Sequence, residues 1–210
     1  MDIQEKEKKD NDQVASWFKD HVVKDHVRMS VGLAGHEFEM LIWKQPGTSI
    51  YQIKYSRLDN VLTVSGDVFE AVYAWSEVKD LRWISGLDLS YFASKCRASE
   101  NGMGYKDWNR DKAREWLEDY LKLQKGANDA EISMLAGKRL KFIDCNGWGE
   151  LHSKGGWIVW LARNGYDVFG DDFTDMENIG SEISLKCRAH LVGLRMAFER
   201  MDRADKGVDG

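Results

Sequence analysis

The spacing of hydrophobic residues changes near Gly66, and this change constrains the fold more than any other feature of the chain. From residue 29 to residue 64 hydrophobic and polar side chains alternate, as in Phe38, Met40 and Ile42, which is typical of half-buried strands. After Gly66 the hydrophobic residues recur every three or four positions, which is typical of amphipathic helices. The sequence therefore predicts a sheet combined with separate helices. The expected strands are residues 29–33, 37–43, 50–55 and 61–64.

Short connections between the expected strands indicate how they pair. Residues 34–36, 45–48 and 58–60 are each of hairpin length, and the second of these connections contains Pro46 followed by Gly47. Proline presets φ at the second position of a turn, and glycine tolerates a positive φ after it. Consecutive hairpins require neighbouring strands to run in opposite directions. We therefore expect a four-stranded antiparallel sheet.

Helical spacing occurs before and after this sheet. An amphipathic helix is expected over residues 14–27, and Asp67 and Asp88 are expected to be the N-caps of two further helices. A longer amphipathic helix is expected over residues 108–123. Beyond residue 126 only helical spacing is found. The helices expected there are residues 128–144, 151–163 and 179–203, the last with Ile183, Cys187, Leu191, Leu194, Phe198 and Met201 along one face.

These elements predict an α+β fold: a four-stranded antiparallel sheet with packed helices, followed by an all-helical C-terminal portion. We divide the chain into a charged tail (1–12), an α+β domain (13–125), a helical domain (126–204) and a short tail (205–210). No strand of four or more residues is expected after Lys125. The sequence leaves open whether the helical portion is a separate domain or covers the same sheet.

The overall charge argues against general nucleic-acid binding. The chain has 35 acidic and 30 basic residues, a net charge of −5, whereas general binding depends on basic groups that neutralise phosphates. The N-terminus is charged and has no apolar core of a signal peptide. The longest apolar run, residues 157–162, is too short to span a bilayer. A cytoplasmic location without membrane association is therefore expected.

No residue pattern indicates a metal site or a catalytic site. The three cysteines, Cys96, Cys145 and Cys187, are far apart and form no CxxC pair. His21 and His26 are five positions apart, which misses the spacing that presents two imidazoles to one zinc ion. The glycines do not form a phosphate-binding loop, and no nucleophile elbow is found. We therefore expect a protein that is not an enzyme and that holds no cofactor and no metal.

Carboxylates are concentrated in residues 167–177, which we call the acidic segment. The alternating carboxylates of a calcium-binding loop are missing from it. Three interpretations remain: a solvated loop held by aromatic side chains, an acidic surface that docks on a basic partner, or a metal site. For the second interpretation the expected partner-binding residues are Asp171, Asp172, Asp175 and Glu177 for charge, with Phe169 and Phe173 as apolar anchors.

Aromatic and basic residues alternate in part of the expected sheet. Stacking on bases by such residues is one way in which a sheet binds single-stranded nucleic acid. Aromatic residues on strands are more commonly ordinary cross-strand pairs of the core. The residues of this alternative nucleic-acid-binding face are Trp43, Lys44, Tyr51, Lys54 and Tyr55.

The N-terminal half resembles small bacteriophage and prophage proteins that have no assigned activity. The resemblance is carried by WKQPGTS (43–49), VSGD (64–67), AVYAW (71–75), ISGLDLSYF (84–92) and KCRAS (95–99). It implies an accessory phage role in the cytoplasm of a bacterial host. It also implies an inhibitor of a host or defence complex, such as a CRISPR effector or another immune nuclease. The C-terminal helices are not part of the resemblance.

Together these observations predict a non-enzymatic phage accessory protein that inhibits its target through an acidic, aromatic surface. The expected partner is a host or defence protein complex with a basic groove that normally holds nucleic acid. The alternative is a nucleic-acid-binding regulator that uses the sheet. The sequence leaves the oligomeric state open between monomer and dimer.

Overall fold

The computed structural model describes residues 3–100, 105–126, 130, 133–138, 154–169 and 179–207. The chain divides into two compact units, each with its own core. Unit 1 comprises residues 1–106 and 183–210, and unit 2 comprises residues 107–182. The chain leaves unit 1 through β7 (Lys106–Trp108) and returns through β8 (Ser181–Ile183), and these two strands pair with each other. Unit 2 is therefore an insertion into unit 1.

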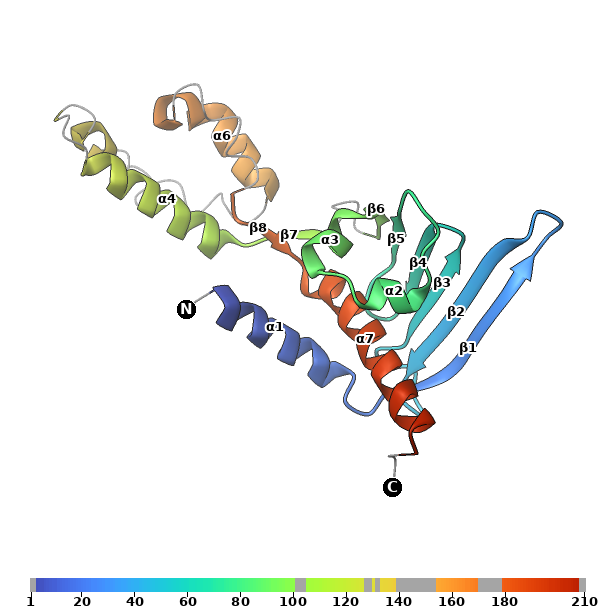
Figure 1. Cartoon of the computed structure of the whole chain (residues 1–210). Helices are drawn as coiled ribbons and strands as arrows, with labels where there is room; N and C mark the ends of the chain where they lie inside the picture. The colour runs from blue at the N-terminus through green and yellow to red at the C-terminus, as the bar shows by residue number, and fades with distance from the viewer. Residues whose placement is uncertain are drawn as a thin grey trace. The chain divides into compact units, whose positions relative to one another are not determined.

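Unit 1 is built on a six-stranded antiparallel sheet in which strands adjacent in sequence are adjacent in space (Figure 1). The α+β class and the antiparallel sheet are thus confirmed, but the sheet has two strands more than expected. The four predicted strands are the first four, each with shifted ends. The strands are β1 (Val22–Val31), β2 (His36–Lys44), β3 (Ile53–Leu58), β4 (Val61–Gly66), β5 (Ala71–Ala74) and β6 (Cys96–Ser99).

The prediction of a helix over residues 14–27 was wrong. The first helix, α1, is Ile3–Trp17, and β1 already begins at Val22. Val22 and Val23 fit a helical stripe, but they pair with Lys44 and Trp43 of β2, and β-branched residues favour strands. Most of the expected charged tail therefore belongs to α1. Its side chains are also bonded to the rest of the unit: Arg188 Nη2 lies 3.6 Å from Asp10 Oδ2, and Arg188 Nη1 donates to Asn11 Oδ1.

Asp67 begins no helix. The residues after it form β5, in which Ala71 and Tyr73 are buried and alternate with more exposed neighbours. This strand was missed because a run of four residues is too short to show its period. The second expected cap is confirmed, since Asp88 Oδ1 accepts from Ser90 N at 2.8 Å at the start of α3 (Leu89–Ser94).

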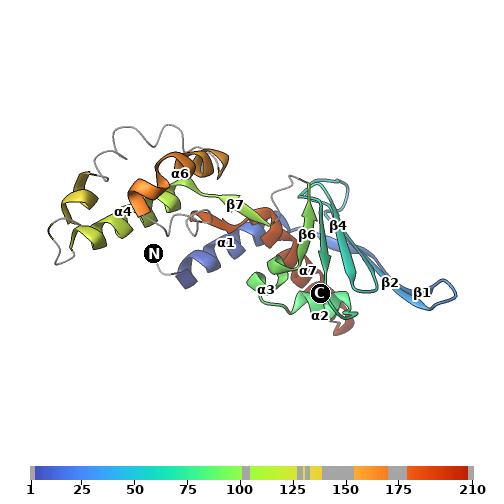
Figure 2. The same cartoon turned by 90° about the horizontal axis from the view of Figure 1, so that it is seen from above.

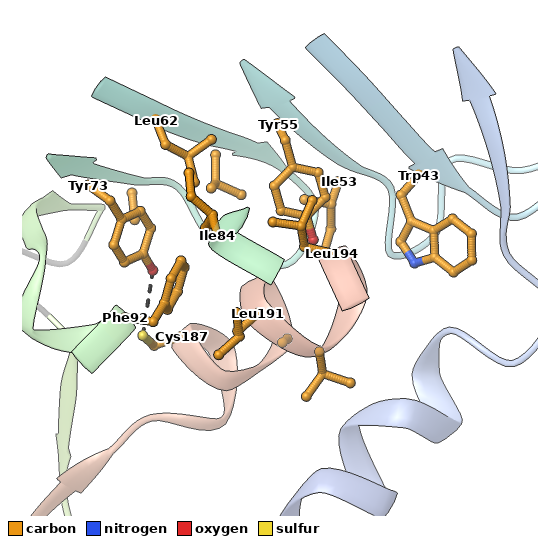
Figure 3. Close-up of a cluster of buried hydrophobic side chains, with 14 of the residues drawn as sticks. Trp43, Ile53, Tyr55, Leu62, Tyr73, Ile84, Phe92, Cys187, Leu191 and Leu194 are labelled. Atoms are coloured by element: carbon orange, nitrogen blue, oxygen red, sulfur yellow. Dashed lines mark hydrogen bonds between the residues drawn. The ribbon is translucent and has the colours of Figure 1, made fainter. Parts of the chain in front are cut away.

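Helices of unit 1 lie on one side of the sheet, as both views show (Figure 1, Figure 2). They are α1, α2 (Leu81–Ser85), α3 and α7 (Leu185–Asp205), and α1 packs mainly against α7. Figure 3 shows side chains of the strands, such as Tyr55 and Leu62, directed toward α7. Gly193 permits a close approach there, because a Cβ at this position would lie 2.8 Å from Tyr55 Oη.

A buried hydrogen-bond network joins α7 to the sheet. Tyr55 Oη donates to His190 O at 2.8 Å, and His190 Nε2 donates to Phe69 O at 2.9 Å. The other ring nitrogen, Nδ1, therefore accepts from Tyr73 Oη at 2.9 Å, and Tyr73 Oη also lies 3.5 Å from Cys187 Sγ. Burial lowers the pKa of His190 to about 4, so the ring is neutral in the folded protein at neutral pH.

Unit 2 has helices around an aromatic core. They are α4 (Arg110–Lys125), the helical residues 133–138 and α6 (Lys154–Phe169). α4 and α6 confirm helices expected nearby, and β8, with three residues, is the only strand after Lys125 in the described part of the chain. The division into units differs from the expected domains. It places α4 in unit 2, and it returns α7 to unit 1, where its hydrophobic face covers the sheet.

The neutral His190 predicts a dependence of stability on pH. An unfolded histidine has a pKa near 6.5, so between about pH 6.5 and pH 4 the unfolded chain binds one proton more than the folded chain at this site. Stability is therefore expected to fall as pH falls through this window, by up to about 1.4 kcal/mol per unit from this group. Urea unfolding at pH 7, 6 and 5 should show a shallower dependence for His190→Gln than for the wild type.

The matched control is His36→Gln, which changes a histidine whose side chain is 54% exposed. It leaves the bonds of His190 in place, so the part of the pH dependence that comes from His190 should remain. His21, whose pKa burial also lowers, supplies part of the slope that remains in His190→Gln. An equal dependence of the unfolding free energy on pH in the wild type and in His190→Gln would contradict the conclusion that His190 is neutral in the folded protein.

Candidate functional site

The acidic segment lies mostly outside the described residues. Asp171, Asp172, Phe173, Asp175 and Glu177 are all in the stretch 170–178, which the structure does not describe. The described chain ends before it at Phe169, the last residue of α6, and resumes at Ile179. The structure therefore describes only the residues that flank this stretch, Phe169 and Ile179.

Both ends of the acidic segment are anchored on one hydrophobic cluster. Phe169 is only 6% exposed, and its ring centroid lies 5.4 Å from that of Tyr120 and 6.3 Å from that of Trp116 on α4. Ile179 packs against the same cluster. Phe169 was expected to contact a partner, and this expectation is corrected: the side chain is buried and holds the segment to its own unit.

Asn109 fixes the return of the chain after the acidic segment. Its backbone N donates to Gly180 O at 2.8 Å, and its side-chain Nδ2 donates to Glu182 Oε1 at 2.7 Å. Its Oδ1 accepts from Lys112 N at 3.1 Å and so caps α4. Gly180 has φ +79°, and a Cβ there would lie 2.7 Å from Ala113 Cβ, so only glycine fits this approach. The chain at Gly180 is therefore held against the start of α4.

The residues of the alternative nucleic-acid-binding face do not share a face. Trp43 and Tyr55 are fully buried beneath the helices, so neither ring is available for stacking on a base. Lys44 and Lys54 lie on the opposite face of the sheet, because neighbouring residues of a strand point to opposite sides. Tyr51 lies in the β2–β3 loop and stacks on Trp17 with ring centroids 5.7 Å apart. The expected face is corrected on these grounds.

A buried ionic cluster around Glu39 was not foreseen from the sequence. Glu39 has no exposed side-chain surface, and its Oε1 accepts from Arg28 Nε at 2.7 Å and from His26 Nε2 at 2.9 Å. Its Oε2 accepts from Leu81 N at 2.9 Å and lies 3.4 Å from Arg57 Nε. One carboxylate thus joins three strands to the first turn of α2.

The pKa of Glu39 shows that its partners outweigh its burial. Burial alone would raise this pKa, but the hydrogen bonds from the Leu81 backbone, His26 and Arg28, with the charge of Arg28, hold it below its ordinary value. Arg57 is also almost fully buried, and it donates to Asp59 O at 2.8 Å. Both carboxylate oxygens of Glu39 therefore have partners, which is typical of a structural cluster rather than an open catalytic site. The one sequence feature that could have indicated this cluster is the position of Glu39 between two hydrophobic residues, Phe38 and Met40.

The described residues contain no group of three or more His, Cys, Asp or Glu side chains placed to hold a metal ion. None of the described helices is both long and apolar enough to cross a membrane.

Removal of the central carboxylate should destabilise unit 1. Glu39→Ala leaves Arg57 without its buried carboxylate partner and the Leu81 N–H without its acceptor. Loss of one partner from a buried ion pair costs about 3–5 kcal/mol. The matched control is Glu37→Ala on the same strand, because Glu37 is 62% exposed and pairs with Arg57 at 3.4 Å. This control should cost at most about 1 kcal/mol. Urea unfolding monitored by circular dichroism measures both, and equal losses would contradict the central role of Glu39.

Comparison with known proteins adds no relative. No family model matches the chain, and neither the curated proteins nor the solved structures searched give a match. The function of the chain is therefore argued from its own residues and from their geometry.

Proposed function

We propose that the chain is a non-enzymatic accessory protein that binds and inhibits a host or defence macromolecule through the acidic segment. The observation that supports this most directly is that Phe169 and Ile179, which flank residues 170–178, pack on the same hydrophobic cluster. A loop held at both ends loses less conformational freedom on binding than a free tail would, so less of its interaction energy is spent on ordering. The segment is thus an internal stretch with both flanks held, rather than a terminal extension.

The charge of the neighbouring helix is consistent with this role. Several basic side chains of α4 already have carboxylate partners in α4 or β8: Lys112 Nζ lies 2.5 Å from Glu182 Oε2, and Arg114 Nε lies 2.7 Å from Glu118 Oε1. The acidic segment adds carboxylates to a unit in which these two basic residues are already engaged. A basic groove on a partner would complement them, and charge attraction would steer the approach.

Inhibition would be steric and electrostatic. A surface of carboxylates that occupies a groove built for nucleic acid competes with phosphates for the same basic residues. The association with phage and with a defence complex, such as a CRISPR effector, rests on the resemblance of the N-terminal half. The bacterial host cytoplasm is where such a target would be met.

The nucleic-acid-binding regulator is the less favoured function. Trp43 and Tyr55, which were expected to stack on bases, are buried in the core. The net charge of −5 also opposes binding to phosphates. Salt-dependent binding of an oligonucleotide by the purified chain would nevertheless establish it.

The charge of the acidic segment can be removed without large effects on the fold. In the triple variant Asp171→Asn, Asp172→Asn and Asp175→Asn, stability should stay within about 0.5 kcal/mol per position. Binding to the partner should weaken, and its dependence on salt should flatten, because screening acts over roughly 8 Å at physiological ionic strength. The measurement is quantitative capture from bacterial lysate at low and high salt, followed by titration of the captured complex.

The matched control removes the same charge from the exposed face of α4, with Asp111→Asn, Glu115→Gln and Asp119→Asn. A partner captured by the wild type and by this control, but not by the segment variant, supports the proposal. The captured complex should also lose its activity when the wild-type chain is added. A segment variant that melts several degrees lower and binds in proportion to its folded fraction would show a structural role for the carboxylates instead.

A further inference from the structure

The face of the six-stranded sheet opposite the helices carries few charges. Strand register fixes which residues share this face, because directly paired residues of antiparallel strands lie on the same side. Beyond Val31 and His36, which lie next to the β1–β2 turn, the first complete row of this face is entirely apolar, and it crosses five strands. Its members, each paired with the next, are Met29, Phe38, Leu58, Val61 and Ala74.

The next row on this face is also uncharged, so the centre of the face contains no charged group. It consists of Val27, Met40, Ser56, Thr63, Val72 and Ala98. Several large side chains of the first row are well exposed: Met29 is 49%, Leu58 48% and Val61 36% accessible. Among the described residues of unit 1 the helices lie on the opposite face (Figure 1, Figure 2). An uncharged exposed face is unusual in a chain in which 31% of residues are charged.

Charged residues occur on this face only toward its edges. The third row contains one acidic and one basic residue. Asp25 lies on β1 and Lys54 on β3, on either side of Ile42 of β2. The register shift between Val23 and Asp25 adds a residue to β1 and so turns Asp25 to this face. Strands are about 4.8 Å apart, so the two charges are separated by roughly 10 Å. No ion pair connects either residue to another described side chain.

We propose that this face is the interface of a symmetric dimer, in which a second copy of the chain packs its own β1–β2–β3 face against the first. The proposal is independent of the acidic segment, which lies in unit 2. Sheets that pack face to face are about 10 Å apart and keep their strands within about 30° of each other. A second copy is therefore an occupant of the right shape for an apolar sheet face.

Charge complementarity selects the second copy and its orientation. A two-fold axis that runs along β2, between the two sheets, places β1 of each copy over β3 of the other. Asp25 then faces Lys54 of the second copy, and Lys54 faces Asp25 of the second copy. In the first row, Met29 meets Leu58 of the second copy, and Phe38 lies on the axis against its own equivalent. One rotation thus pairs both charges and brings together the two uncharged rows of each copy.

Two contacts of this arrangement are less favourable, and both lie near the axis at the ends of β2. His36, which pairs with Val31 on this face, would approach His36 of the second copy. Lys44 lies at the end of β2 and would approach Lys44 of the second copy near the axis. Its position at the end of the strand lets the long side chain turn its ammonium group toward solvent. Since only three strands of each copy overlap, the interface is small, and we expect dissociation in the micromolar range.

Charge reversal tests the pairing in the purified full-length chain without any partner. Asp25→Lys would place two lysines opposite each other twice per dimer, and Lys54→Asp would do the same with two aspartates. Each single variant should weaken dimerisation about tenfold or more. The double variant should restore it to within about threefold of the wild type, because the opposite charges then face each other again. Sedimentation equilibrium over about 5–200 µM measures the dissociation constants.

Two controls keep the outcome specific. Glu199→Lys makes the same charge change at an exposed position of α7, on the helical side, and should leave dimerisation unchanged. Met29→Asp places a charge in the apolar row and should give a monomer, whereas Leu33→Asp, at the fully exposed tip of the β1–β2 turn, should not. Circular dichroism melting confirms that each variant is folded.

A wild-type chain that remains monomeric up to 200 µM would overturn the proposal. So would a dimer that the single charge reversals weaken but the double reversal does not restore, since the charges would then not face each other. The result that supports it is a dimer with restoration in the double variant. None of these outcomes depends on whether the acidic segment binds a partner.

Discussion

The docking of α7 on the sheet is the interaction on which unit 1 depends. α7 comes from the far end of the chain, yet Tyr55 and Tyr73 on the strands both bond to His190 on it. A buried phenol or imidazole without a partner costs about 1–3 kcal/mol, so these bonds define one position of α7 among the many that hydrophobic contact alone would permit. Gly193 adds a steric condition, because the helix can approach Tyr55 only where no Cβ intervenes. Hydrophobic burial supplies most of the driving force, while the polar network selects the register.

This docking also explains why an insertion is tolerated. The sheet and α7 form one core, although unit 2 separates them in sequence. The ends of the insertion lie close together because β7 pairs with β8, so the core requires only that those two strands meet. Closing a longer loop between fixed ends costs little more free energy, because the entropic cost of closure grows only with the logarithm of the loop length. Unit 2 could therefore change in length and sequence with small effects on unit 1, which suits a segment that meets a partner.

Particular residues show how far the sequence could predict this structure. Phe38, Met40 and Ile42 alternate clearly, so β2 and its neighbours were predicted, and Asp88 has both a capping side chain and a following hydrophobic stripe. Val22 and Val23 satisfy both periods, so the choice between helix and strand depended on pairing with β2, which is a distant contact. The ion cluster of Glu39 depends on side chains from three strands and a helix. Phe169 was assigned to a partner surface because sequence does not reveal that Tyr120 covers it.

The two proposed surfaces differ in chemistry, and this difference bears on how they would act together. The sheet face is uncharged at its centre, so it gains from the hydrophobic effect, which salt does not screen. The proposed action of the acidic segment would depend on charge attraction, which salt screens over roughly 8 Å at physiological ionic strength. A dimer formed through the sheet would carry two acidic segments, so a target with two basic grooves could engage both. The second contact would then be intramolecular, and overall affinity would exceed that of one segment by a factor set by the geometry of the two sites. Steep salt dependence of partner binding, together with a weaker salt dependence of dimerisation, would follow from this separation of roles.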